Sequence, residues 1–139
     1  MKKIIIIAIL FISGNIIAQT GTIELTVSGI NLKKGKNIKV AVYDKAGFLK
    51  EMNIQKTIQA KGKEITIELN DVEVGKYAIA VFQDENSDGK MNTNFMGKPI
   101  ELSGFSNNVK GDFGPPDFNN TSFDVFNDKS IKLVIHLMK

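Results

Sequence analysis

Apolar and polar residues alternate along most of the chain beyond residue 20, as they do in strands that bury one face. This spacing predicts five clear and two weaker strands, over residues 22–28, 38–42, 65–69, 77–82 and 131–137, and over residues 54–60 and 121–126. No stretch of ten or more residues repeats its apolar positions with the period of an amphipathic helix. The chain is therefore predicted to be all-β, an antiparallel β-sandwich of about seven strands with one long loop.

The first 18 residues have the three parts of an export signal. Lys2 and Lys3 supply positive charge, residues 4–12 form an apolar run, and Ala18 is a small residue suited to cleavage. The apolar run is shorter than the roughly 20 residues that a membrane-spanning helix needs, so a cleaved signal peptide is favoured over an uncleaved anchor. We predict a signal peptide over residues 1–18 and a single β-sandwich domain over residues 19–139, located in the periplasm or outside the cell.

The composition excludes several kinds of chemistry. The chain has no cysteine, and its single histidine, His136, is expected on the outward face of the last strand. Without Lys2 and Lys3 the chain keeps 16 lysines against 15 acidic residues, a net charge of +1, and it has no arginine. Nucleic-acid binders usually carry a surplus of Arg and Lys that neutralises phosphates. We therefore expect no nucleic-acid partner, and no stable membrane span after signal cleavage.

Residues 84–118 interrupt the alternation. They are rich in glycine, asparagine and aspartate, and they contain all three prolines of the chain. A loop of this length is uncommon within a compact domain and is often functional. The aromatic residues of the loop are expected to form a small core of their own, made of Phe95, Phe105, Phe113 and Phe118.

The start of this loop matches the first half of an EF-hand calcium loop, D-x-N-x-D-G. Oxygen atoms at alternate loop positions can converge on one cation, and Gly89 permits the sharp reversal that this requires. The candidate calcium ligands are Asp84, Asn86, Asp88, the backbone carbonyl of Lys90, and Asn92. Position twelve is Phe95 instead of a bidentate glutamate, so the expected calcium affinity is weak, with Kd around 10⁻⁴–10⁻³ M. The alternative is an Asx-rich turn without an ion.

Several motifs resemble those of one bacterial family. V-G-K-Y-A-I-A-V-F at residues 74–82, followed after one residue by D-E-N, resembles the hallmark of domain-of-unknown-function family 2141. G-K-P-I-E at residues 97–101 and G-F-S-N at residues 104–107 are similar to two further motifs of that family. F-G-P-P-D-F at residues 113–118 is similar to a fourth. The resemblance implies an exported bacterial protein with one β-sandwich domain and no assigned activity.

The resemblance covers residues 22–138, and the chain departs from it at two positions. Gln83 stands where the family commonly has histidine, and Asn92 stands where it commonly has aspartate. The second departure weakens the candidate calcium site further. The same stretch is similar, more loosely, to Cna-B-type and prealbumin-like modules of surface proteins, which implies an immunoglobulin- or prealbumin-like sandwich.

These observations lead us to expect a non-catalytic module that binds an envelope protein or a glycan, or that supports the cell envelope. The expected binding loop consists of Glu101, Phe105, Ser106, Asn107, Pro115 and Pro116. The alternative is a small secreted hydrolase whose candidate carboxylates are Asp84, Glu85, Asp88 and Glu101. Two carboxyls about 5–9 Å apart across an open cleft favour the hydrolase, whereas carboxylates turned toward one cation-sized space favour calcium.

Overall fold

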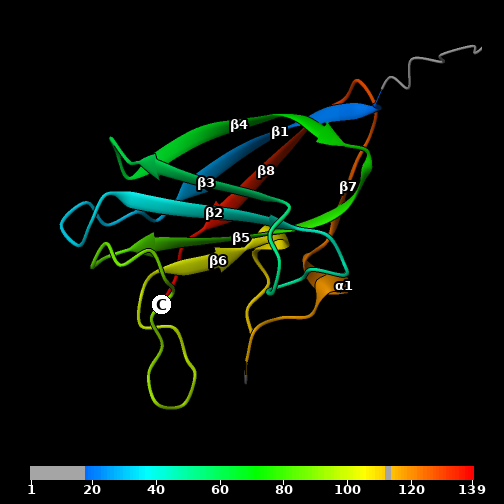
Figure 1. Ribbon diagram of the computed structural model, residues 1–139. Helices are drawn as coiled ribbons and strands as arrows, with labels where there is room; N and C mark the ends of the chain where they lie inside the picture. The colour runs from blue at the N-terminus through cyan, green and yellow to red at the C-terminus, as the bar shows by residue number, and fades with distance from the viewer. Residues whose placement is uncertain (1–17, 112–113) are drawn as a thin grey trace, which may run out of the picture.

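Eight strands form two sheets in the computed structural model, which describes residues 18–111 and 114–139 (Figure 1). The smaller sheet has the order β4-β1-β8. Its strands are β1 (Thr20–Ser28), β4 (Glu64–Glu73) and β8 (Ser130–His136). β1 is antiparallel to β4 and parallel to β8, so the central strand of this sheet joins two segments far apart in the sequence.

The larger sheet has the order β3-β2-β5-β6, and β7 also pairs with β5. Its strands are β2 (Asn37–Tyr43), β3 (Ile54–Gln59), β5 (Gly75–Asp84), β6 (Ser103–Phe105) and β7 (Phe123–Val125). β6 pairs with Ala80, Val81 and Phe82, whereas β7 pairs with the first three residues of β5. The two short strands therefore share one edge of β5, with a gap between them.

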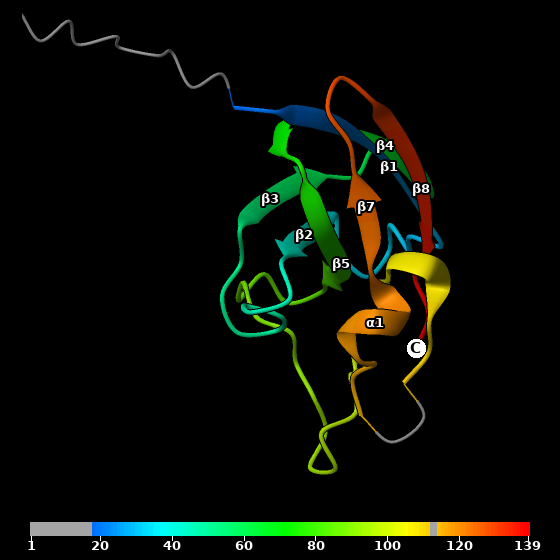
Figure 2. The same cartoon turned by 90° about the vertical axis from the view of Figure 1, so that its right-hand side faces the viewer.

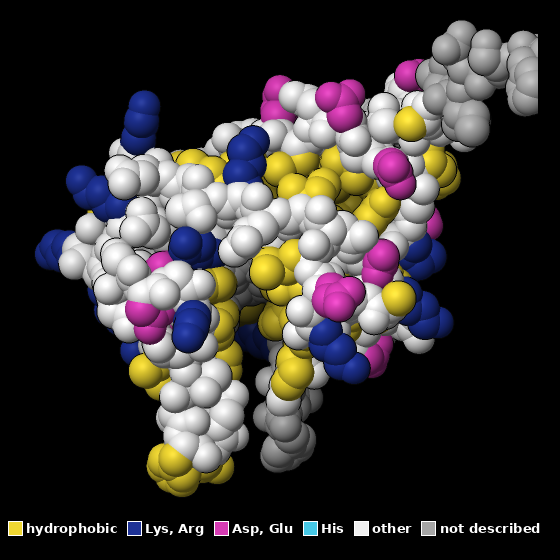
Figure 3. Space-filling model, viewed as in Figure 1, with side chains coloured by type: hydrophobic (Ala, Val, Ile, Leu, Met, Phe, Trp, Pro, Cys, Tyr) yellow, Lys and Arg dark blue, Asp and Glu magenta, His cyan; other side chains and the backbone are white. Residues whose placement is uncertain are grey.

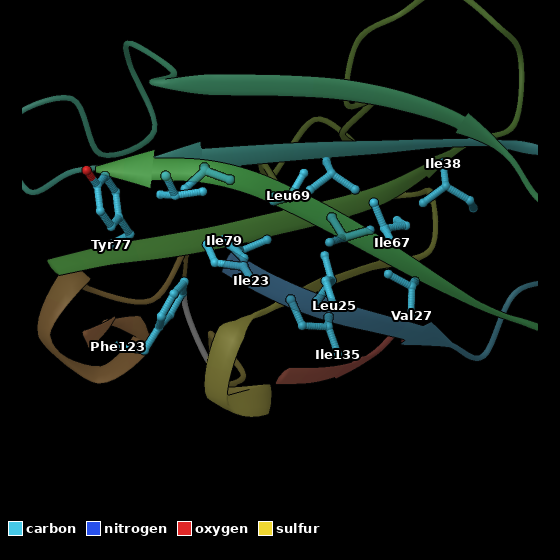
Figure 4. Close-up of a cluster of buried hydrophobic side chains, with 14 of the residues drawn as sticks. Ile23, Leu25, Val27, Ile38, Ile67, Leu69, Tyr77, Ile79, Phe123 and Ile135 are labelled. Carbon is cyan, nitrogen blue, oxygen red and sulfur yellow. The ribbon is translucent and has the colours of Figure 1, made fainter. Parts of the chain in front are cut away.

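The core lies between the two sheets and is made by the inward residues of the alternating strands (Figure 4). Leu25 of β1 is paired with Ile67 of β4, and Val40 of β2 is paired with Val81 of β5. The largest hydrophobic side chains with less than 2% exposure are Ile23, Leu25, Val27, Ile38, Val40, Val42, Val72, Ile79, Val81, Val125 and Ile135. Burial of these aliphatic side chains is the main favourable contribution to folding.

The structure confirms the predicted all-β sandwich and corrects two of its details. The described residues contain eight strands, where about seven were expected. The additional strand is β6, whose three residues are too few to show an alternating pattern. One pairing, between β1 and β8, is parallel. The alternation of residues identifies which face of a strand is buried, but it carries no information about the direction of the neighbouring strand.

Two short helical segments lie near the edges of the sheets (Figure 2). A 3₁₀ turn, Ser106–Asn108, follows β6, and α1 (Phe118–Thr121) precedes β7. Asp117 caps α1 by accepting the backbone N–H of Asn120 (3.1 Å). In the part of the chain that the structure describes, no helix has the length and apolarity needed to cross a bilayer. The predicted signal peptide lies almost entirely outside the described residues.

A long connection between β5 and β6 leaves the body of the sandwich (Figures 1 and 2). It begins with the predicted calcium loop at Asp84 and returns to the sheet at Glu101. Between them, residues 92–100 project away from both sheets, and we call this segment the finger. The finger and the loop at its base contain most of the polar residues singled out from the sequence.

Candidate functional site

The loop at residues 84–92 starts from Asp84, the last residue of β5. Asp84 Oδ2 accepts the backbone N–H of Gly89 at 2.9 Å, which closes the first turn of the loop. Gly89 has φ +78°, in the left-handed region that favours glycine, so the reversal predicted at this position is present. The first and sixth residues of the motif are thus joined directly.

The second carboxylate oxygen of Asp84 is left without a partner. Asp84 is buried, and its Oδ1 has no hydrogen-bond partner among the described residues. The nearby charge is the ammonium of Lys39, which lies 4.0 Å from Oδ2. A buried carboxylate oxygen that is not hydrogen-bonded is costly, so this atom is a candidate contact for a cation.

Asn86, Asp88 and Asn92 hydrogen-bond with one another on the exposed side of the loop. Asn86 Nδ2 and Asn92 Nδ2 both donate to Asp88 Oδ2, at 3.0 and 2.9 Å. Asp88 Oδ1 accepts the backbone N–H of Lys90 at 2.8 Å. The hydrogen bond from Asn92, with those from Lys90 and Asn86, lowers the pKa of the Asp88 carboxyl below its usual value. Asp88 is thus ionised in the conditions in which a cation would bind.

Glu101 fastens both ends of this loop from the opposite side. Its Oε1 accepts the backbone N–H of Glu85 at 2.8 Å, and its Oε2 accepts the backbone N–H of Asn92 at 2.9 Å. Its side chain is buried, with an exposure of 3%. The sequence placed Glu101 among the binding-loop residues and among the candidate carboxylates of a hydrolase. In the structure it holds the root of the finger.

The loop has part of what a calcium ion needs. Asp84 offers a buried free oxygen, but Asn86 and Asp88 are bonded to each other. Within the described residues no three His, Cys, Asp or Glu side chains are arranged around a common metal position. A cation bound jointly by Asp84, Asn86 and Asp88 would therefore have to replace the mutual hydrogen bonds of Asn86 and Asp88. The residue types fit calcium, and the loop geometry requires a local rearrangement.

The finger ends in a tight turn at Asn94–Gly97. The N–H of Gly97 donates to the carbonyl of Asn94, and the N–H of Asn94 donates to the carbonyl of Lys98, both at 2.9 Å. The two residues at the end of the turn, Phe95 and Met96, are 97% and 76% exposed. Figure 3 shows the resulting apolar tip at the end of a largely polar projection.

The exposure of Phe95 contradicts the expectation that the aromatic residues of the long loop form their own core. Both arms of the finger leave the sandwich, so the ring of Phe95 has no sheet beneath it. Phe118 is buried instead against Phe48, with the ring centroids 5.5 Å apart, and Phe105 lies half-buried in β6. Phe113 lies outside the described residues.

Two residues of the expected binding loop, Ser106 and Asn107, make hydrogen bonds within the fold. Ser106 is fully buried, and its Oγ accepts the N–H of Ile79 at 2.9 Å and donates to the carbonyl of Thr121. Ile79 lies in the gap between the residues of β5 that pair with β6 and those that pair with β7. Asn107 Nδ2 donates to the carbonyls of Asn120 and Ser122, both at 3.0 Å.

The two remaining residues of that set, Pro115 and Pro116, precede α1. Pro115 is exposed and Pro116 is buried. The predicted binding-loop residues are therefore spread over the root of the finger, β6, the 3₁₀ turn and the segment before α1.

Sequence analysis missed two polar side chains with clear structural roles. Gln83 is fully buried on the inward face of β5, where its amide accepts the N–H of Asn31 at 3.0 Å and donates to the carbonyls of Asn31 and Gly35. Its position two residues after Val81, on the same face, was the available signal. Asn108 Nδ2 donates to the carbonyl of Val134 at 2.9 Å, and Asn108 Oδ1 accepts the N–H of His136 at 2.8 Å. The side chain of Asn108 therefore covers the edge of β8.

Comparison with known proteins assigns the chain to a family. The family model described as "Uncharacterized protein conserved in bacteria (DUF2141)" matches residues 25–133, which include all eight strands at least in part. No curated protein and no solved structure matches the chain significantly. The match extends from β1 to β8 and includes the loop, Glu101 and the finger. The chain is therefore a member of the bacterial DUF2141 family.

Proposed function

We propose that this protein is an exported, non-catalytic binding module of the cell envelope, and that it makes contact through its finger. The observation that carries the proposal is the exposed pair Phe95 and Met96 at the end of a hydrogen-bonded projection. A large exposed apolar group costs solubility and is common at binding surfaces. Its position at the tip of a segment fastened by Glu101 supports a role in contact with another component.

Two of the four carboxylates expected in the alternative hydrolase, Glu101 and Asp84, make hydrogen bonds that hold the loop. Glu101 is buried and both its oxygens accept backbone N–H groups, and Asp84 closes the turn to Gly89. A general acid or nucleophile has to reach its substrate, which buried and engaged carboxyls do poorly. The arrangement favours binding over hydrolysis.

The proposal predicts that the protein stays with the envelope because of its finger. The full chain should be produced in a bacterial host, and the envelope and soluble fractions compared between the wild type and the Phe95→Ser/Met96→Ser double variant. We expect the wild type in the envelope fraction and the double variant mostly in the soluble fraction. Phe126→Ser is the matched control, because Phe126 is also exposed (60%) but follows β7, away from the finger.

The same fractionation tests export, because cleavage near residue 18 shortens the chain by a mass that mass spectrometry resolves. Equal distribution of the wild type and the double variant between the fractions would show that the finger does not make the contact. Recovery of the uncleaved chain in the cytoplasm would show that the proposed location is wrong.

A second role, weak calcium binding by the loop at residues 84–92, is favoured by the unpartnered Oδ1 of Asp84. Calcium prefers carboxylate and carbonyl oxygens, and bound there it would lie beside a buried carboxylate whose ion-pair partner in the described residues is Lys39. The ion would stabilise the folded loop and take no part in any reaction.

We expect calcium to raise the stability of the protein in a manner that depends on Asp84. With Kd around 10⁻⁴–10⁻³ M, about 10 mM Ca²⁺ should add about 1.4–2.7 kcal/mol to the free energy of unfolding. Titration calorimetry and thermal melts in Ca²⁺ and in EDTA measure this directly. Asp84→Asn should remove the difference, whereas Glu68→Gln, on the exposed face of β4, should keep it. Identical wild-type melts in Ca²⁺ and EDTA would refute calcium binding.

A further inference from the structure

Most backbone N–H groups of the fingertip are hydrogen-bonded within the tip. Asn94 Oδ1 accepts the N–H groups of Met96 and Lys98, at 2.9 and 3.0 Å. The N–H groups of Asn94 and Gly97 are bonded to carbonyls within the same turn. Four of the five backbone N–H groups of residues 94–98 thus have partners inside the tip. An unpaired N–H group is costly to remove from water, so this tip can enter an apolar environment at a low cost.

The charge of the finger has one sign. Within residues 92–100 the one ionisable residue is Lys98, which is exposed, and there is no acidic residue. Lys90 precedes the finger and lies two residues after the exposed Asp88. The nearest acid that follows, Glu101, is buried at the root. An apolar end beside an exposed lysine, with no acidic residue in the finger, matches the surface of a membrane that contains anionic lipids, where the lysine meets headgroups and the apolar side chains enter the acyl boundary.

The shape of the tip also favours a lipid surface over a protein partner. Phe95 and Met96 stand at the end of a narrow projection, and Figure 3 shows the tip as a convex end. A stable protein interface buries a total of about 1,200–2,000 Å², more than two side chains can provide. A bilayer interface needs no complementary pocket, because lipids rearrange around an inserted side chain.

We propose that the finger docks the protein on anionic phospholipid bilayers by inserting Phe95 and Met96, with Lys98 at the headgroups. This inference rests on the proposed function and names the envelope component that the finger contacts. Neither residue of the tip packs in the core, so the docking surface exists without a change in the fold.

The absence of tryptophan from the chain allows a direct test. In a Phe95→Trp variant the only indole stands at the tip, and its fluorescence reports whether the tip leaves water. Vesicles of equal parts phosphatidylglycerol and phosphatidylcholine should shift the emission to the blue, and pure phosphatidylcholine vesicles should do so much less. Phe126→Trp is the matched control and should show no shift, since Phe126 follows β7 at the far end of the sandwich.

Sedimentation with the same vesicles measures binding of unlabelled protein purified after export. Phe95→Ser should weaken binding about tenfold to a hundredfold, the loss expected when one phenyl ring is no longer buried. Lys98→Gln should weaken it about fivefold at low salt and less at high salt, whereas Lys129→Gln, in the turn before β8, should have no effect. Urea midpoints equal to the wild type would confirm that these exposed variants fold.

The possible results separate this inference from the proposed function. A blue shift at position 95 with loss of binding in Phe95→Ser supports lipid docking. Finger-dependent association with the envelope, combined with no response to protein-free anionic vesicles, would make the contact a protein or glycan and overturn the lipid inference alone. No finger dependence in either experiment would overturn both proposals.

Discussion

Ser106→Ala is expected to destabilise the protein by about 2–4 kcal/mol, because it leaves two buried backbone groups without partners. These are the N–H of Ile79 and the carbonyl of Thr121, which both bond the Ser106 hydroxyl. β5 has no strand partner for Ile79 on this side, since β6 and β7 pair with the residues after and before it. Urea denaturation followed by circular dichroism measures the change in the free energy of unfolding.

The matched control is Ser103→Ala, three positions earlier in the chain at a partly exposed site of β6. That change is expected to alter stability by less than about 0.5 kcal/mol. The comparison also distinguishes a structural role for Ser106 from the binding role suggested by its motif. If Ser106→Ala kept wild-type stability and lost only association with the envelope, Ser106 would be a contact residue and our interpretation would be wrong.

Glu101→Ala is expected to release the loop at residues 84–92 and to lower stability by roughly 2–4 kcal/mol. Two hydrogen bonds to a charged carboxylate, from the N–H groups of Glu85 and Asn92, are lost together. The local effect can be read from hydrogen exchange of those two amides. Each should exchange at least about tenfold faster relative to amides in β1, where the fold is unaffected.

Two further variants define the effect of Glu101. Glu101→Gln keeps one acceptor oxygen and presents an NH₂ group to the other amide, so its loss should be intermediate between the wild type and Glu101→Ala. Glu68→Ala, on the exposed face of β4, should stay within about 0.5 kcal/mol of the wild type. Slow exchange of the Glu85 and Asn92 amides in Glu101→Ala would mean that the carboxylate does not close the loop.

The strands were predictable because their signal is local. In β1, β2, β4 and β8 the buried residues follow from a period of two that a single sequence displays. The weaker strands expected at residues 54–60 and 121–126 are present as β3 and β7. The alternating pattern could not predict which strands pair. Partners such as β1 and β8 are distant in the sequence, and neither segment contains information about their relative direction.

The loop residues were located by their motif, but their roles depend on contacts that the motif does not contain. The spacing of Asp84, Asn86 and Asp88 was compatible with ligands around one ion, and the structure shows Asn86 and Asp88 bonded to each other. Glu101 was predicted to be a contact residue or a hydrolase carboxylate, and it accepts the backbone N–H groups of Glu85 and Asn92 at the two ends of the loop. Hydrogen bonds between residues this far apart in the sequence can be identified only from the three-dimensional structure.

The parallel pairing of β1 with β8 has a consequence for the order of folding. Ser28 and His136 are bonded across this pair and are separated by 108 residues of chain. The β1 strand therefore keeps one open edge until nearly all of the domain has been synthesised, and its sheet closes late. Folds dominated by such distant pairings form in milliseconds to seconds, far more slowly than helical domains. Until β8 is in place, the free N–H and C=O groups on that edge of β1 can pair with strands of other molecules, so the last segment of the sheet also protects the protein against aggregation.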